Sequence, residues 1–305
     1  MKHKNNSPIR FKSLSEMHRV LGLPKPLHPL VSVVDDMYIK VGAEKLTGSF
    51  LLDFYKISFV TSLSGKLKYG QGFYDFDEGG MFFFAQNQII SDYDDTLNFT
   101  GYTIFIHPNF LSGTSLANKI KKYGFFSYST NEALYLSETE KKTIVSVFKI
   151  IDEELKLPID DFSQDVIISQ IELLLNYSNR FYKRQFITRK STNQSLLQKM
   201  ETILEDYFTN DKTSNLGLLT VQYLAEQLNV TPQYLSDLLR SLTGQNTQQH
   251  IHNKLIEKAK EKLSTTDLSV SEIAYELGFE YSQSFSKLFK SKTNQSPSEF
   301  RTSFN

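Results

Sequence analysis

Residues 220–246, TVQYLAEQLNVTPQYLSDLLRSLTGQN, and residues 269–296, SVSEIAYELGFEYSQSFSKLFKSKTNQS, are two copies of one pattern. Their first halves match at a constant shift of 49 positions, and after a one-residue insertion their second halves match at a shift of 50. Each copy contains a short amphipathic segment, a turn and a second amphipathic segment. This pattern predicts two helices joined by a tight turn, so we expect two helix-turn-helix motifs in an all-helical C-terminal domain.

The residues at the two turns have the conformational properties that such a motif requires. Ala225 and Ala274 are small enough for the two helices of a copy to cross closely. Asn229 and Gly278 follow the first helices, where a left-handed backbone is needed and Asn or Gly tolerates it. Thr231, which precedes a proline, is expected to cap the second helix of the first copy.

The second helix of each copy has one apolar face, which we expect to point into the domain. Its residues are Leu235, Leu238, Leu239 and Leu242 in the first copy and Phe285, Leu288 and Phe289 in the second. The opposite face is polar and is expected to point outward. Its residues are Gln233, Ser236, Asp237 and Arg240 in the first copy and Gln283, Ser286, Lys287, Lys290 and Lys292 in the second.

A third helix is expected between the copies, at residues 248–263. Ile251, Leu255, Ala259 and Leu263 recur there at strict four-residue spacing. Such a helix of about 16 residues would be about 24 Å long and would act as a rigid spacer. Two recognition helices held apart by this rod can enter successive major grooves on one face of DNA, whose repeat is roughly 34 Å.

Residues 218–302 resemble the C-terminal domain of the AraC family of bacterial transcription regulators. The residues that carry this resemblance most specifically are Ile273-Ala274, Glu276-Leu277-Gly278-Phe279, Phe285, Phe289-Lys290, Ser296-Pro297, Phe300 and Arg301. The part of the chain before them is similar only in general layout to the cupin-like effector and dimerisation domains of that family. The resemblance implies DNA-dependent control of transcription, often activation, with double-stranded DNA as partner, RNA polymerase as a further expected partner and frequently a small-molecule inducer.

Three positions depart from the family pattern. Asn294 stands where Gly is usual after the second recognition helix, an exchange that a left-handed cap tolerates. Leu255 occupies a position in the connecting helix that is often Arg, which removes one phosphate or bridging contact. Asp237 lies at a base-facing position where basic residues are common; its carboxylate repels phosphates but can accept a hydrogen bond from cytosine N4.

The polar faces of the two recognition helices are the candidate site. We interpret Gln233, Ser236, Asp237, Gln283, Ser286 and Lys287 as facing base edges, and Arg240, Lys290 and Lys292 as holding phosphates. The alternative for each residue is that it merely keeps a helix surface soluble. Residues 196–305 carry 11 basic and 13 acidic side chains, which argues against strong non-specific binding, although residues 281–292 carry three lysines and no acid.

The composition of the whole chain indicates a folded protein of two domains. It has 305 residues, 34 basic and 34 acidic side chains and no cysteine, which excludes disulfides, thiolate metal sites and cysteine nucleophiles. Residues 180–195 carry five basic side chains and no acidic one, a composition typical of an exposed connection or of a phosphate-contacting segment. We therefore expect domains at residues 1–186 and 196–305, joined by a linker at residues 187–195.

Residues 30–106 have the pattern of short strands separated by glycine-containing turns. With the helices that follow, this predicts an α+β fold whose N-terminal domain is a small, cupin-like β-barrel. Ten phenylalanines are expected to line or fill it: Phe50, Phe54, Phe59, Phe73, Phe76, Phe82, Phe83, Phe84, Phe99 and Phe105. The barrel can either pack solidly or hold one small apolar ligand.

After residue 107 the period of the apolar residues becomes helical. Ser137, with Glu140 three positions later, has the pattern of a helix N-terminus. The next helix, at about residues 160–186, has a main apolar stripe and a second one that contains Val166, Leu173 and Tyr177. One stripe can cover the barrel and the other can meet a second copy, which predicts a homodimer; the alternative is burial of both stripes within one chain.

No pattern of residues predicts catalysis, a metal or a cofactor. No histidine lies between His28 and His107, and His250 and His252 are expected to lie at the surface. No apolar stretch approaches the roughly 20 residues of a membrane helix, and residues 1–14 lack the apolar region of a secretory signal. We therefore expect a cytoplasmic, non-enzymatic regulator; the alternative is a metal-free cupin-like enzyme or small-molecule-binding protein whose C-terminal domain serves other contacts.

Overall fold

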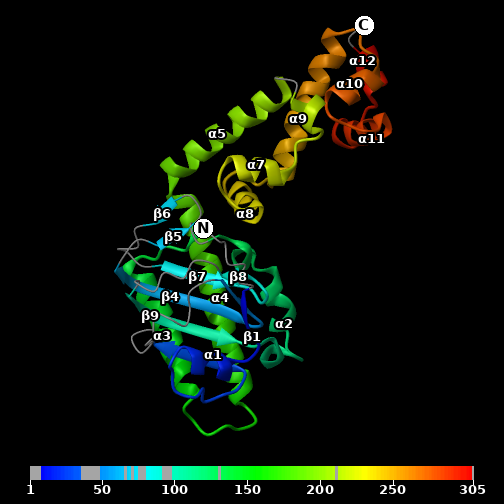
Figure 1. Ribbon diagram of the computed structural model, residues 1–305. Helices are drawn as coiled ribbons and strands as arrows, with labels where there is room; N and C mark the ends of the chain where they lie inside the picture. Colours follow the sequence, from blue (N-terminus) through cyan, green and yellow to red (C-terminus); the bar gives the residue numbers. More distant parts are fainter. Residues whose placement is uncertain are drawn as a thin grey trace, which may run out of the picture. The chain divides into compact units, whose positions relative to one another are not determined.

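The chain divides into two compact units, Met1–Gln185 and Phe186–Asn305. The computed structural model describes residues 8–35, 49–64, 67–69, 72–74, 80–90, 98–129, 132–209 and 212–303. Every strand among these residues belongs to the first unit, and the second unit is helical (Figure 1). The α+β class with an all-helical C-terminal part is thus confirmed. The expected end of the first domain, residue 186, adjoins the division between the units.

The described strands of the first unit form three sheets. A four-stranded antiparallel sheet has the order β2 (Val31–Asp35), β9 (Asn98–Ile106), β4 (Tyr55–Ser64) and β7 (Gly80–Phe84). A second sheet has the order β1 (Ile9–Phe11), β3 (Phe50–Leu52) and β8 (Ile89–Ile90), with β1 and β3 parallel. The third pairs β5 (Leu67–Tyr69) with β6 (Gly72–Tyr74). Closure of these strands into a cupin-like barrel stays a prediction.

The pairing of β4 with β9 in the four-stranded sheet contains an irregularity that depends on a glycine. The register between β4 and β9 shifts between Val60 and Ser62, and Val60 lies opposite Gly101. A Cβ atom at Gly101 would lie only 1.9 Å from the carbonyl oxygen of Phe59. Glycine is therefore required here so that the two backbones can approach closely.

The aromatic residues of the first unit pack against one another. Phe50, Phe54, Phe59, Phe82, Phe83 and Phe105 are buried, and Phe84 is half-buried. The side chains of Phe73, Phe76 and Phe99 lie outside the described residues. The rings of Phe54 and Phe105 meet edge to face with centroids 5.8 Å apart. The space beside Phe82, Phe83 and Phe125 is about 10 Å³, at the lower limit for one water molecule.

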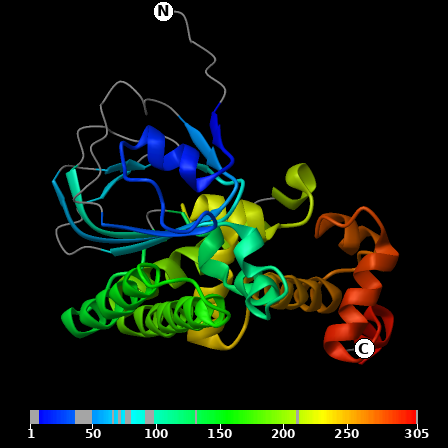
Figure 2. The same cartoon turned by 90° about the horizontal axis from the view of Figure 1, so that it is seen from below.

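The helices of the first unit follow the strands, apart from α1. They are α1 (Leu14–Val20), η2 (Pro108–Leu111), α2 (Leu116–Lys119), η3 (Ile120–Lys122), η4 (Gly124–Ser127), α3 (Glu138–Glu154) and α4 (Ser163–Thr188). The capping box expected at Ser137 and Glu140 is present at the start of α3. Arg184 of α4 also pairs with Glu140 at 2.6 Å. The two long helices of this unit, α3 and α4, are green in Figure 2 and lie side by side.

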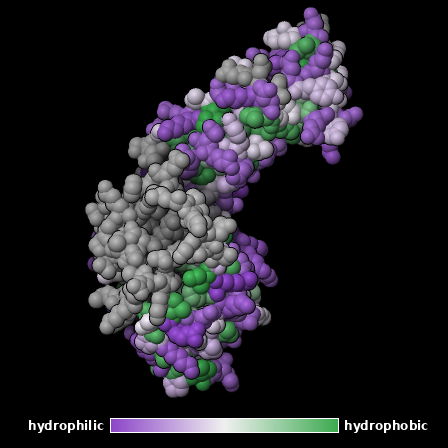
Figure 3. All heavy atoms as spheres, viewed as in Figure 1, coloured by the Kyte–Doolittle hydropathy of each residue, from purple (hydrophilic) through white to green (hydrophobic). Residues whose placement is uncertain are grey.

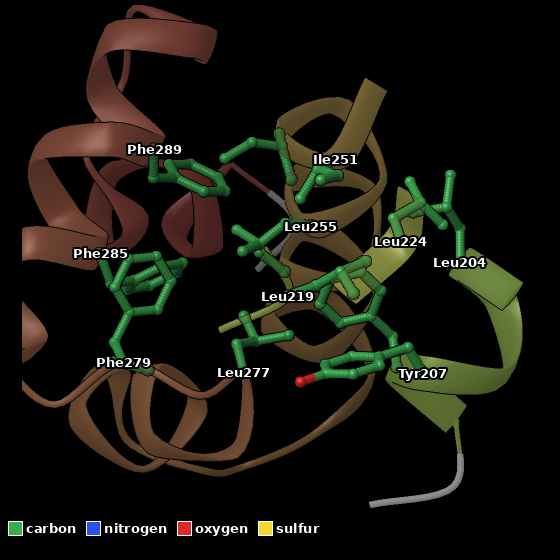
Figure 4. Close-up of a cluster of buried hydrophobic side chains, with 14 of the residues drawn as sticks. Leu204, Tyr207, Leu219, Leu224, Ile251, Leu255, Leu277, Phe279, Phe285 and Phe289 are labelled. Carbon is green, nitrogen blue, oxygen red and sulfur yellow. The ribbon is translucent and has the colours of Figure 1, made fainter. Parts of the chain in front are cut away.

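The second unit is built around one long helix, α9. Its helices are α5 (Lys190–Thr209), α6 (Lys212–Leu216), α7 (Val221–Gln227), α8 (Pro232–Thr243), α9 (Thr247–Thr265), α10 (Val270–Glu276), α11 (Ser282–Thr293) and α12 (Pro297–Thr302). Figure 4 shows apolar side chains from α5, α7, α9, α10 and α11 meeting in one cluster. Ile251 and Leu255 of α9 are each 1% exposed, because side chains at four-residue spacing lie on one helix face.

The segment expected to be an exposed linker is largely helical. Of residues 187–195, the first two end α4 and the last six begin α5, which leaves only Arg189 outside a helix. Asn193, expected in an exposed connection, is 5% exposed and donates a hydrogen bond from Nδ2 to the carbonyl oxygen of Phe186. Polar residues near helix ends satisfy backbone groups that the helix leaves free, which explains this correction.

On the face seen in Figure 3, hydrophilic side chains prevail over the C-terminal unit. A search of the described residues for a helix both long enough and apolar enough to cross a membrane finds none.

Candidate nucleic-acid interface

The two motifs of the C-terminal unit have the same backbone geometry. In the first, the amide of Val230 donates to the carbonyl of Ala225 at 3.0 Å; in the second, the amide of Phe279 donates to the carbonyl of Ala274 at 2.9 Å. Ala225 and Ala274 are both fully buried, as expected for residues at which two helices cross. The sequence repeat at a shift of 49 is thus a structural repeat of a helix and a turn.

Both turns pass through a left-handed residue, as predicted. The φ angle is 55° at Asn229 and 89° at Gly278. The surroundings of the two residues differ, because a Cβ atom at Gly278 would lie 2.6 Å from the carbonyl carbon of Gly217. The segment before α7 therefore packs backbone against backbone on the second turn.

The ends of the recognition helices confirm the expected caps. The hydroxyl of Thr231 accepts a hydrogen bond from the amide of Tyr234, and a proline begins α8. Both helices end in a left-handed residue, Gly244 with φ 78° and Asn294 with φ 61°. Asn294 thus serves as the cap that was expected of it despite replacing glycine.

The apolar faces of the two recognition helices point inward, as predicted. Leu235, Leu238, Leu239, Phe285 and Phe289 are fully buried, and Leu242 and Leu288 are half-buried. The rings of Phe285 and Phe289 pack together with centroids 5.8 Å apart. Burial of these side chains fixes the rotation of each helix about its axis and so decides which polar side chains face outward.

The polar face of α8 forms a hydrogen-bonded network. Gln233 and Arg240 are exposed, and both contact the half-buried Asp237 between them. The hydroxyl of Ser236 lies 3.0 Å from that of the buried Thr247 at the start of α9. Ser236 therefore also joins α8 to α9, a contact that the sequence did not predict.

The polar face of α11 is more open and more positively charged. Gln283, Lys287, Lys290 and Lys292 are exposed, and Ser286 is half-buried. The helix carries three lysines and no acidic residue, whereas α8 carries one acid and one base. The two candidate reading surfaces therefore have different charges.

The connecting helix is longer than predicted and is more than a spacer. α9 has 19 residues, about 28 Å at 1.5 Å per residue. The carboxylate of Glu205 on α5 pairs with Lys254 at 2.7 Å and with Lys258 at 2.6 Å. These two lysines lower the pKa of Glu205 to about 2. Four-residue spacing of Lys254 and Lys258 is the signal that could have indicated a shared partner.

The two histidines of α9 are half-buried, not surface residues as expected. Nε2 of His250 lies 2.9 Å from the hydroxyl of Thr243, and Nε2 of His252 lies 2.8 Å from Nε2 of Gln248. Burial lowers the pKa of both imidazoles. Among the described residues no group of three or more potential ligands could hold a metal ion.

The duplicated motif, the buried alanines and the outward polar faces define a double helix-turn-helix domain, the class of fold that presents recognition helices to DNA. Residues 224–303 match the family model described as Helix-turn-helix domain. The C-terminal unit is therefore a helix-turn-helix domain of the AraC type, and the chain is similar to AraC-family transcription regulators.

The similar proteins include regulators from several bacteria. The Msm operon regulatory protein of Streptococcus mutans is 23% identical over 83% of this chain and 86% of its own length. The HTH-type transcriptional activator RhaS of Salmonella paratyphi B is 28% identical over 46% of this chain and 45% of its own length. The chain covers only 14 to 45% of the length of several other curated relatives.

One solved structure is similar over the C-terminal unit. It is the C-terminal domain of the two-component response regulator yesN from Fusobacterium nucleatum. It is 31% identical and covers 34% of this chain and 95% of its own, with a TM-score of 0.30.

Proposed function

We propose that this protein is a transcription regulator that binds specific double-stranded DNA sequences through α8 and α11. The observation that carries this proposal is the repeated helix-turn-helix geometry, in which the second helix of each motif buries its apolar face and exposes its polar one. On this proposal Gln233, Ser236, Asp237, Gln283, Ser286 and Lys287 approach base edges, and Arg240, Lys290 and Lys292 approach phosphates.

We further propose that the protein acts as an activator in the cytoplasm and that it contacts RNA polymerase. The RhaS relatives are named transcriptional activators, and regulation of this kind requires access to the chromosome. We propose that this regulator is not an enzyme, because the helix-turn-helix domain and the regulator relatives favour control of transcription over a metal-free enzyme.

The first unit is proposed to form a homodimer through α4. Val166 and Leu173 are 38% and 40% exposed, and Phe162 at the start of the helix is 72% exposed. Val166 and Leu173 lie seven residues apart and so share one face of the helix, which Phe162 directly precedes. A second copy would cover this stripe and present two DNA-binding domains to a repeated site.

The first unit is also proposed to bind a small-molecule effector. A cavity of about 660 Å³ lies beside β2 and the last two turns of α3, and a volume of this size suits a small ligand. Its lining includes Tyr102, Lys149 and the buried His18 but none of the phenylalanines expected to line a barrel. We therefore propose that the effector binds outside the aromatic core.

Selection of bound sites from a pool of random duplexes with the full-length protein tests the proposed function. A single recovered motif, bound more tightly than a scrambled duplex, is the expected result, and motifs in tandem or inverted pairs would agree with a dimer. Recovery of no motif at any salt concentration would contradict the proposal. Thermal shifts with a panel of small metabolites test the effector site, since a ligand at 100 times its Kd adds about 2.7 kcal/mol of stability.

A further inference from the structure

Asp237 is the centre of the polar network on the exposed face of α8. Its Oδ2 accepts a hydrogen bond from Nε2 of Gln233 at 3.0 Å, and its Oδ1 accepts one from Nη1 of Arg240 at 3.0 Å. The partners lie four residues before it and three residues after it, so all three side chains share one helix face. The side chain of Asp237 is 22% exposed and that of Arg240 is 55% exposed, so the cation lies outermost.

This network makes the charge of α8 unlike that of α11. The single cation of α8 is already paired with a carboxylate, whereas the described contacts of α11 include no ion pair to Lys287, Lys290 or Lys292. Binding to DNA of any sequence comes from neutralising phosphates. It follows that α11 contributes most of the sequence-independent attraction and that α8 contributes little while Arg240 is paired with Asp237.

We propose that Asp237 is a specificity-determining residue, which restrains Arg240 from binding phosphates on DNA of the wrong sequence. The inference rests on the proposed DNA-binding function. An exposed ion pair within a helix is weak, so Arg240 can leave Asp237 for a phosphate. The carboxylate is then left beside a polyanion unless a base donates to it.

Only bases that donate a hydrogen bond can stabilise the Asp237 carboxylate beside the phosphates. In the major groove, cytosine N4 and adenine N6 are the amino groups that donate a hydrogen bond to a carboxylate, and guanine and thymine present acceptors at the corresponding positions. On a site with an amino group at the right place, Asp237 exchanges its protein partners for the base. On other sites the carboxylate keeps Arg240 or remains unpaired, and discrimination arises from this difference.

The test compares the full-length wild-type chain with the Asp237→Asn variant, which keeps the size of the side chain and removes its charge. The probes are the duplex recovered by selection with the wild-type protein and a scrambled duplex of the same length. The Kd of each protein for each duplex is measured between 50 and 200 mM KCl. Thermal unfolding of both proteins checks that the substitution leaves the fold intact.

We expect Asp237→Asn to bind the scrambled duplex more tightly and to lose at least about fivefold in the ratio of specific to scrambled affinity. The slope of log K against log salt on the scrambled duplex should become steeper by about 0.9, the value for one more phosphate contact. An unchanged ratio and slope would overturn the proposal. Absence of any selected duplex would instead contradict the proposed function itself, so the two failures are distinguishable.

Two further variants separate the mechanism from a general change in charge. Asp237→Asn combined with Arg240→Gln should return the salt slope to its wild-type value, because the freed guanidinium is then absent. Glu261→Gln removes the same charge from the exposed face of α9, where Glu261 pairs with Lys258 at 3.3 Å. This control should leave the affinity ratio unchanged; a loss as large as that of Asp237→Asn would overturn the assignment to Asp237.

Discussion

Gly278 occupies its turn for two physical reasons, of which the sequence indicates only one. Its φ of 89° lies in the left-handed region, which Asn229 also adopts in the first motif. Only at Gly278 does another backbone lie where a Cβ would be, with the carbonyl carbon of Gly217 at 2.6 Å. Both turns therefore need a residue that adopts the left-handed backbone. The second turn also needs a residue without a Cβ atom, because the backbone of Gly217 packs against it.

We expect Gly278→Ala to destabilise the C-terminal unit by about 2–4 kcal/mol, the range of a strained and overpacked site. Asn229→Ala is the matched control and should cost about 1–2 kcal/mol, because only the left-handed backbone is strained there. Urea unfolding of the full-length variants, followed by circular dichroism, measures both. Equal losses of unfolding free energy in the two variants would show that the close contact with Gly217 does not affect stability.

Glu205 makes the stability of the C-terminal unit sensitive to acid. Lys254 and Lys258 lower its pKa from 4.5 to about 2, so folding favours the ionised carboxylate. The stabilisation is complete above about pH 4.5 and is lost as the pH falls towards 2. The Tm difference between the wild type and Glu205→Gln should therefore be constant from pH 7 to about 5 and shrink below it. A difference that does not change down to pH 2.5 would refute this account.

At the scale of single helices, α8 and α11 share a backbone and differ in the charge of their outer faces. The repeated hydrogen bonds of the turns and the left-handed C-terminal caps make the two motifs alike. Three lysines without an acid on α11, and a paired Asp237 and Arg240 on α8, make their surfaces different. We therefore expect substitutions on the two faces to change different properties of DNA binding.

Lys290→Ala should weaken binding by a similar factor on every duplex and should make the salt slope shallower by about 0.9. Gln283→Ala should instead change the preferred base at one position of the selected site, by about 1–3 kcal/mol. Both side chains are exposed on α11, so neither change should alter the Tm. Selection from random duplexes with each variant provides the measurement, and an equal loss on all DNA for both would contradict the assigned roles.

At the scale of the molecule, the two units expose different kinds of surface, and on our proposal each surface binds a different partner. The C-terminal unit presents polar recognition helices, and the first unit presents the apolar stripe of α4. Because Val166, Leu173 and Phe162 are exposed within the chain, a soluble monomer would keep this stripe in water. A partner copy would bury it.

Leu173→Glu should weaken self-association at least about tenfold, because a carboxylate buried in an apolar contact between two copies has no partner. The Tm should change little, since the side chain is exposed in one chain. Light scattering across a dilution series measures the oligomeric state. Gln198→Glu, which adds a charge to the exposed face of α5, should leave it unchanged; a monomeric wild type would disprove the proposed dimer.

The sequence determined most of the C-terminal unit. Apolar residues at helical spacing, alanines at the crossings and the residues Asn229, Gly278 and Thr231 indicate helices, turns and caps by local chemistry alone, and all are found where expected. Family resemblance supplied the class of function. Local rules are reliable here because a helix and its caps depend on residues three or four positions apart.

The tertiary structure decided what depends on contacts between distant residues. The sequence did not indicate that Gly217 packs on Gly278, that Glu205 binds two lysines of α9, or that Asn193 is buried in the expected linker. It also missed the short strand β1, which lies outside residues 30–106 and whose three residues are too few to show a period. Such features arise only when the folded chain brings separate segments together, so the spacing of residues within one segment does not identify the partner.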